Sequence, residues 1–88
     1  MQSELLQEIE RAAVKSSPAP KDLRPPESML YYMLLGLYAA YQAGKIDKSQ
    51  GHLHKTQIYK IYNRMNDDYT QFTDICKLYQ ERIRQGVS

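Results

Sequence analysis

The chain of 88 residues contains one cysteine, one phenylalanine and no tryptophan. A single cysteine, Cys76, excludes an internal disulfide framework and is typical of a protein from a reducing compartment. The longest apolar run covers residues 29–41, which is shorter than the roughly 20 residues of a membrane-spanning helix. The first residues also lack the basic segment and apolar run of a secretory signal. The sequence therefore predicts a cytoplasmic protein without a membrane anchor.

Signatures of catalysis are missing as well. The chain is too short for a dinucleotide-binding sheet with a substrate domain, or for a large barrel. It has no glycine-rich phosphate loop, no ordered Ser-His-Asp set and no paired acidic motif. His52 and His54 stand two residues apart, so on a helix they point away from each other and do not share a metal ion. We therefore expect no enzyme activity, no cofactor and no metal.

The pattern that is present predicts one all-α domain over residues 1–88. Apolar residues recur at helical spacing over residues 3–17, which predicts a short amphipathic helix. All four prolines follow soon after, and we expect a stiff linker over residues 18–26. A second helix is expected over residues 27–43, with Gly44 as its left-handed C-terminal cap.

The third predicted helix is the longest and covers residues 47–85. Asp47 followed by Gln50 fits a capping box at its start. Apolar residues then form a heptad series from Ile58 to Ile83, in alternating steps of four and three. The composition of Asn66-Asp67-Asp68 favours a break near residue 66, but the series passes through it. We therefore expect a continuous helix, with a break at residue 66 as the alternative.

The lengths of these helices indicate that one copy does not cover its own apolar surface. The second helix would be about 26 Å long and the third about 57 Å, so a hairpin leaves half of the third uncovered. The first helix or another copy must cover the rest, and we expect a homo-oligomer, most simply a two-fold dimer. The expected interface residues are Met29, Met33, Gly36, Tyr69, Phe72, Cys76 and Tyr79.

Positive charge gathers in residues 45–64, which carry five basic residues and one acidic residue. Two lysines, a histidine and a tyrosine recur there at spacings of 4, 3 and 4, so they fall on one stripe of the helix. Lysine neutralises a phosphate and tyrosine offers a stacking surface for a base. The alternative is a solvated helix face beside a tyrosine-rich core. The predicted ligand-binding residues are Lys48, His52, Lys55 and Tyr59, with Arg64 and Tyr41 as further contributors.

The segment from Leu37 to Asp47, LYAAYQAGKID, is followed by Gln50-Gly51. This Leu-Tyr-x-x-Tyr-x-x-Gly-x-Ile pattern, with prolines before it, resembles small helical accessory proteins of phages and prophages of Gram-positive bacteria. The resemblance covers residues 25–65 and implies a helical hairpin. By analogy with other short phage proteins, it implies counter-defence by stoichiometric binding in the cytoplasm of the host cell.

Three binding functions follow from these observations. The leading hypothesis is sequestration of an anionic nucleotide signal by the basic stripe. The second is a protein-occluding inhibitor or adaptor of a host effector such as a nuclease, which would use the tyrosine- and methionine-rich faces of the second helix. The third is a nucleic-acid-binding regulator, which the modest net charge of +2 disfavours.

Overall fold

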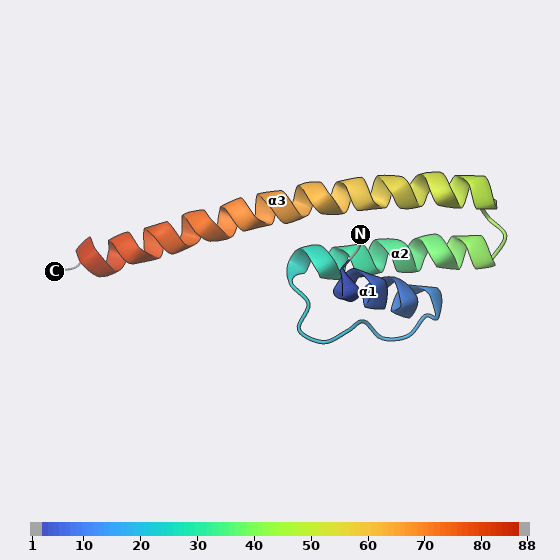
Figure 1. The fold of residues 1–88 in the computed structure, drawn as a ribbon, viewed down its shortest axis with the longest axis horizontal. Coiled ribbons are helices and arrows are strands. Elements are labelled where there is room, and N and C mark those ends of the chain that lie inside the picture. The colour runs from blue at the N-terminus through green and yellow to red at the C-terminus, as the bar shows by residue number, and fades with distance from the viewer. Residues whose placement is uncertain (1–2, 87–88) are drawn as a thin grey trace.

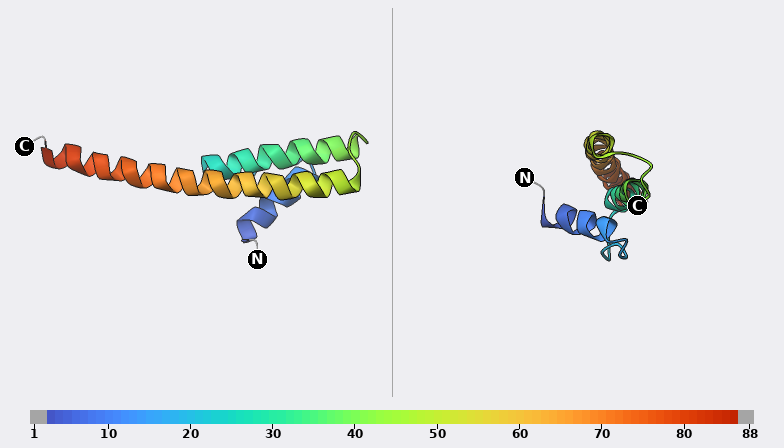
Figure 2. Two further views of the ribbon diagram at one scale, coloured as in Figure 1. Left: turned by 90° about the horizontal axis from the view of Figure 1, so that it is seen from above. Right: turned by 90° about the vertical axis from the view of Figure 1, so that its right-hand side faces the viewer.

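The computed structural model describes residues 3–86, with side chains described for residues 3–84, and this part of the chain contains three helices and no strand. The helices are α1 (Glu4–Val14), α2 (Pro25–Gln42) and α3 (Lys48–Gly86) (Figure 1). The predicted all-α fold is thus confirmed. α2 and α3 form an antiparallel hairpin, and α1 crosses this pair steeply (Figure 2). The predicted domain also included residues 1–2 and 87–88, which lie outside the described residues.

α1 ends at Val14, before the predicted end at residue 17. Its start is capped by Ser3, whose hydroxyl accepts a hydrogen bond from the N–H of Leu6 at 3.2 Å. At its other end Ser16 adopts a left-handed backbone with φ 55°, and the N–H of Ser17 donates to the carbonyl of Ala12 at 2.9 Å. This ending resembles a Schellman motif. The helix therefore stops through its own backbone geometry, ahead of the prolines.

α2 begins at Pro25, two residues before the predicted start. Pro25 and Pro26 stand in the first turn, where N–H groups have no helical acceptor, so proline is tolerated there. At the other end Gly44 adopts φ 74°, and the N–H of Lys45 donates to the carbonyl of Ala40 at 3.0 Å. Gly44 is therefore the left-handed cap that the sequence predicts.

α3 runs without interruption over Lys48–Gly86. Asp47 and Gln50 cap its start reciprocally: the N–H of Gln50 donates to Asp47 Oδ1 at 2.8 Å, and the N–H of Asp47 donates to Gln50 Oε1 at 3.1 Å. The helix continues through residues 66–68, where the hydroxyl of Thr70 donates to the carbonyl of Asn66 at 2.9 Å. It is one continuous helix, as the heptad series predicts.

The core lies where α2 is enclosed by its two neighbours. The backbone of α2 contacts both α1 and α3, whereas among the described residues α1 and α3 contact each other through side chains. The hydroxyl of Tyr31 donates to the carbonyl of Ser17, which ties the segment just after α1 to α2. Buried apolar side chains come from all three helices and are Ile9, Ala13, Leu30, Tyr31, Leu34 and Tyr62.

The C-terminal half of α3 projects beyond this core, so the molecule measures 62 × 24 × 23 Å (Figure 1). The other helices contact only the first part of α3, because α2 has 18 residues and α3 has 39. The residues predicted to form an oligomer interface lie on surfaces that the chain covers incompletely. Met29, Gly36, Phe72 and Tyr79 are exposed, and Met33, Tyr69 and Cys76 are half-buried.

Gly44, which caps α2, and Gly36, which lies within α2, allow a matched test of the turn. Gly44→Ala should lower the free energy of unfolding by about 1 kcal/mol, because an L side chain is strained at that φ. Gly36→Ala should raise it by about 0.5–1 kcal/mol, because a Cβ at Gly36 meets no atom within 4 Å and alanine favours the helix. Urea denaturation followed by circular dichroism measures both. A destabilising Gly36→Ala would contradict the open face and indicate close contact with another chain.

Candidate anion-binding site

A hollow of about 270 Å³ lies between the last turns of α2 and the first turns of α3. The Gly44 turn brings these segments together by reversing the chain between them. Four of the six predicted ligand-binding residues line this hollow, although one is on α2 and three are on α3. We name it the helix-end hollow; its lining residues are Leu37, Tyr38, Tyr41, Lys48, Gly51, His52 and Lys55.

Tyr41, Lys48 and His52 form the open part of the helix-end hollow. The Tyr41 side chain is 44% exposed, so one part of the ring remains accessible. Lys48 and His52 are exposed on the first turns of α3. Gly51 lies beside the ring, since a Cβ built there would be 3.9 Å from Tyr41 Cδ2. The absence of a side chain at Gly51 therefore leaves space next to the aromatic surface.

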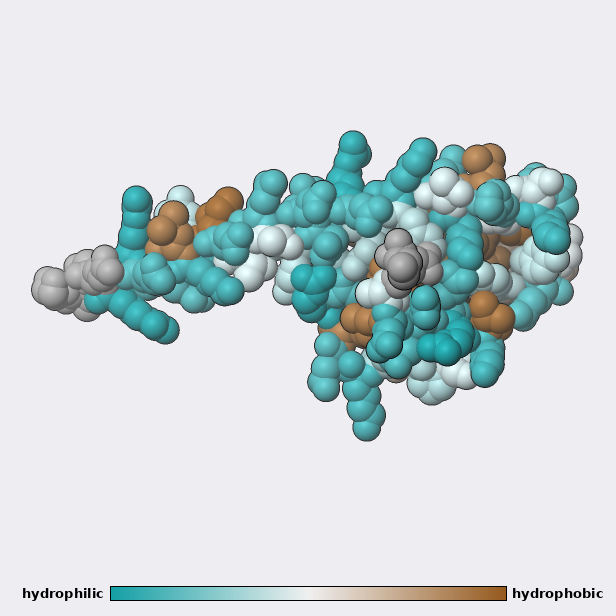
Figure 3. Space-filling model, in the orientation of Figure 1, coloured by the Kyte–Doolittle hydropathy of each residue, from teal (hydrophilic) through white to brown (hydrophobic). Residues whose placement is uncertain are grey.

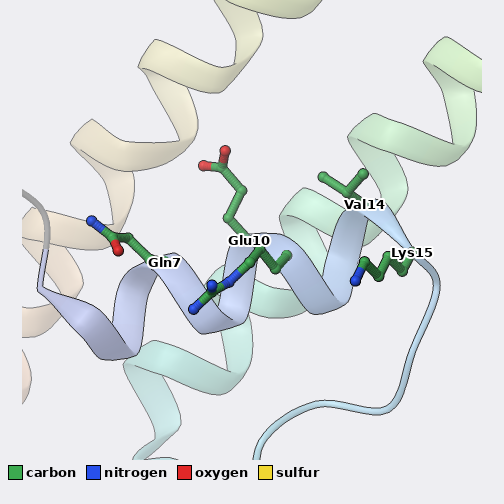
Figure 4. A pocket seen from close by; sticks show the side chains of 5 residues that line it. Gln7, Glu10, Val14 and Lys15 are labelled. Atoms are coloured by element: carbon green, nitrogen blue, oxygen red, sulfur yellow. The ribbon is translucent and has the colours of Figure 1, made fainter.

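Lys55 is the less exposed of the two lysines that line the hollow, and it is bound by an acidic residue from α1. Its Nζ is 2.8 Å from Glu10 Oε2, the hydroxyl of Tyr59 donates to Glu10 Oε1 at 2.8 Å, and the hydroxyl of Tyr38 donates to Oε2 at 3.4 Å. Figure 4 shows Glu10 extending from α1 toward the other two helices, at the rim of a hollow of about 320 Å³ on α1. These four residues, the Glu10 cluster, join all three helices.

The Glu10 cluster favours the ionised carboxylate. Burial by itself raises the pKa of Glu10, but hydrogen bonds from Lys55 and Tyr59, together with the charge of Lys55, lower the pKa below its usual value. The hydrogen bond to Glu10 raises the pKa of Lys55, because it stabilises the charged ammonium group. Both groups are therefore charged at neutral pH, and the positive charge of Lys55 is balanced within the protein.

This arrangement changes the interpretation of the basic stripe. Lys55 and Tyr59 are half-buried against α1, so the stripe is neither a fully solvated face nor a row of uncommitted cations. Glu10 was not among the residues predicted to form the site. The signal was its position beside Ile9 and four residues after Leu6, at the edge of the apolar side of α1.

Tyr59 and Arg64 lie outside the helix-end hollow. Tyr59 lines an adjacent hollow of about 360 Å³ with His52, Lys55 and other residues of α3. Arg64 follows Tyr59 by five residues, about 140° round the helix, and lines a separate hollow with Ile61 and Asp68. The structure therefore does not bring Arg64 together with the other predicted ligand-binding residues.

A second hydrogen-bonded carboxylate, also missed from the sequence, joins the start of α2 to the middle of α3. Glu27 is 1% exposed; its carboxylate accepts hydrogen bonds from Arg24 at 2.7 Å and from the hydroxyl of Tyr62 at 2.6 Å. Burial and the hydrogen bond to Glu27 raise the pKa of Tyr62 to about 12. Arg24 also donates to Asn66 and lies over the Tyr69 ring, 5.7 Å from its centroid. Arg24 is exposed on its outer side, and none of these residues lines the helix-end hollow.

Neither a metal cluster nor a membrane span is found in the described part of the chain. Among residues 3–86, no three His, Cys, Asp or Glu side chains gather closely enough to hold a metal ion. None of the helices formed by these residues combines the length and apolarity needed to cross a membrane. Comparison of the chain with protein-family models, with curated proteins and with solved structures finds no match.

The hydrogen-bonded carboxylates of Glu10 and Glu27 predict acid-sensitive stability. Burial raises the pKa of Glu27, but hydrogen bonds from Arg24 and Tyr62 outweigh it and lower the pKa below the ordinary 4.5. A lowered pKa stabilises the fold above the unfolded-state value, and this stabilisation is lost as the pH falls through the folded-state value. Glu27→Gln should therefore lower the free energy of unfolding by about 2 kcal/mol at pH 7, and the difference from wild type should shrink below pH 4.5.

Urea denaturation across this pH range measures the effect, with Glu81→Gln as the control, because Glu81 is exposed on the projecting half of α3. A difference between wild type and Glu27→Gln that stays constant with pH would contradict the ionic role of Glu27.

Proposed function

We propose that the protein is a non-enzymatic binding protein that sequesters an anionic nucleotide in the helix-end hollow. The observation that carries this proposal is the convergence of Tyr41 from α2 with Lys48, His52 and Lys55 from α3 on one hollow. An aromatic ring beside ammonium groups supplies the two interactions that a nucleotide needs, stacking for the base and charge neutralisation for the phosphate.

The charge of the hollow favours an anion beside Lys48. Lys48 stands in the first turn of α3, where the helix dipole adds partial positive charge. Asp47 caps this turn and offsets part of that charge. Lys55 donates to Glu10 in the free protein, so an anion gains its second ammonium by sharing Lys55 with Glu10. We therefore assign the primary phosphate contact to Lys48 and the base contact to Tyr41.

The size of the hollow favours a small ligand over a nucleic acid. Its volume of about 270 Å³ is near the lower end of small-molecule pockets, which run from about 300 to 1,000 Å³. A polynucleotide-binding surface needs a longer basic track, and Arg64 lies on another side of α3. Similarity of the hairpin pattern to phage accessory proteins supplies the proposed setting, in which the protein removes a nucleotide signal of host defence.

Replacement of Lys48 tests the proposal directly. Lys48→Glu should weaken binding of a mononucleotide or cyclic nucleotide by roughly 10- to 100-fold, because a charge-assisted contact becomes a repulsion. Lys60→Glu makes the same change in charge on the same helix but outside the helix-end hollow, so its effect should be small. Isothermal titration with a panel of linear and cyclic nucleotides measures both variants. Absence of heat across the whole panel with the wild-type protein would refute the proposal.

A substitution in the Glu10 cluster provides a second test by the same titration. Glu10→Gln removes the carboxylate that balances Lys55, so the hollow gains net positive charge. Nucleotide affinity should rise several-fold if the ligand uses Lys55, at the expense of fold stability. Circular dichroism checks that the variant remains helical. Unchanged affinity in a helical variant would restrict the contact to Lys48 and Tyr41.

The second candidate function is occlusion of a host protein by the outer face of α2. Met29 is 51% exposed and Tyr32 is 65% exposed, and residues of both kinds are enriched at the centres of protein interfaces. Tyr32 also holds a fixed orientation, since its ring lies edge-to-face with the Tyr31 ring at 5.3 Å.

A pull-down from host lysate separates the two functions. Occlusion predicts one dominant captured protein, whose capture is lost with Tyr32→Lys and retained with Lys48→Glu. Nucleotide sequestration predicts that nucleotide binding in the titration is weakened by Lys48→Glu and retained with Tyr32→Lys. It also predicts that the pull-down captures no protein in a manner that depends on Tyr32.

A further inference from the structure

The projecting half of α3 carries an apolar side that no other part of the described chain covers. Phe72 and Ile83 are each 64% exposed, Tyr79 is 59% exposed and Ile75 is 51% exposed. Apolar surface gathers on this half of α3, among otherwise hydrophilic side chains (Figure 3). Exposure of so many large apolar side chains on one helix indicates a contact surface.

The spacing of these residues fits the seam of a two-stranded coiled coil. Met65, Tyr69, Phe72, Cys76, Tyr79 and Ile83 follow one another in steps of 4, 3, 4, 3 and 4. The helix is continuous over the whole of this seam, which is about 27 Å long. Met65 and Tyr69 are partly covered by the core, so the seam begins there and becomes more exposed toward Ile83.

We propose that a second copy of this chain covers the seam by pairing antiparallel with the projecting half of α3. In the proposed register Phe72 lies opposite Cys76 of the partner subunit, and Tyr69 lies opposite Tyr79 of the partner subunit. The two-fold axis repeats each contact, so one helix supplies both halves of the interface.

The residues that flank the seam select this register. Asp68 lies beside the partner's Arg82, and the symmetry repeats this ion pair at the other end of the interface. Ile75 lies beside the partner's Ile75 at the centre, where both side chains are removed from water. Flanking charges of this kind set the orientation and register of coiled coils.

Other arrangements lose this complementarity. A shift by one heptad in either direction places Ile75 beside the partner's Asp68 or the partner's Arg82. A parallel pairing places Asp68 beside the partner's Thr73 and Ile75 beside the partner's Gln80. Each of these leaves the charged residues unpaired or sets an apolar side chain against a polar one, so the antiparallel register is favoured.

Charge exchange tests the register, with the mass in solution measured by analytical ultracentrifugation. The wild-type protein should be a dimer, and Asp68→Arg should raise its dissociation constant by roughly tenfold or more, because two attractions become two repulsions. Adding Arg82→Asp to this variant should restore the dimer. Asp67→Arg is the matched control, because this neighbour lies off the seam and should leave the dissociation constant nearly unchanged.

Thiol cross-linking tests the orientation. Phe72→Cys should give a cross-linked dimer through Cys76 of the partner subunit, because opposed seam positions come within disulfide distance. Neither the wild-type protein nor Phe72→Cys combined with Cys76→Ser should cross-link efficiently. A parallel pair would instead cross-link through Cys76 alone.

Three results would overturn the proposal: a monomeric wild-type chain, efficient cross-linking of wild-type protein through Cys76, or a charge-exchanged double variant that stays as weak as Asp68→Arg. A monomer would assign the seam to a different partner protein. Helix content from circular dichroism separates loss of pairing from loss of folding. Nucleotide binding should survive Asp68→Arg, because the helix-end hollow lies at the opposite end of α3, so failure of the dimer is distinguishable from failure of the proposed function.

Discussion

The buried carboxylate of Glu27 fixes the register of the hairpin. Its hydrogen bonds to Arg24 and Tyr62 hold the first turn of α2 against the middle of α3. The ion pair tolerates burial because both carboxylate oxygens have partners, whereas an unpaired charge there would be strongly destabilising. With this point fixed, the Gly44 turn determines which half of α3 lies along α2. The helix-end hollow and the projecting seam are therefore at opposite ends of α3 for the same reason.

Local signals in the sequence were sufficient to predict the hairpin. Gly44, the reciprocal cap of Asp47 with Gln50, and the helical periodicity act within a few residues, and each appears in the structure as expected. Continuity through residues 66–68 was a harder case, since asparagine and aspartate are poor helix formers. The contacts of Arg24 with Asn66 and Tyr69 stabilise the helix at this point. The uninterrupted heptad pattern was the signal in the sequence that predicted a continuous helix here.

Contacts across the linker could not be predicted in the same way. Glu10 meets Lys55 and Tyr59 after a change of chain direction through the proline segment, and no periodicity links residues so far apart. The spacing of Lys48, His52 and Lys55 correctly predicted that they lie on one side of a helix. The spacing did not indicate that α1 covers part of that side. Arg64 was grouped with them by its charge alone, although its angular position on the helix excludes it.

Lys55 connects the two parts of the site, because it belongs to both the Glu10 cluster and the helix-end hollow. The backbone of α1 contacts α2 and not α3 within the described chain, and the Glu10 hydrogen bonds add a polar link to the apolar core that α1 shares with α3. An anion that attracts Lys55 competes with Glu10, and a firmly docked Glu10 reduces the charge offered to that anion. Linkage requires this coupling to be reciprocal. In the proposed nucleotide-binding protein, the position of α1 and the affinity of the hollow are therefore controlled by the same ammonium group.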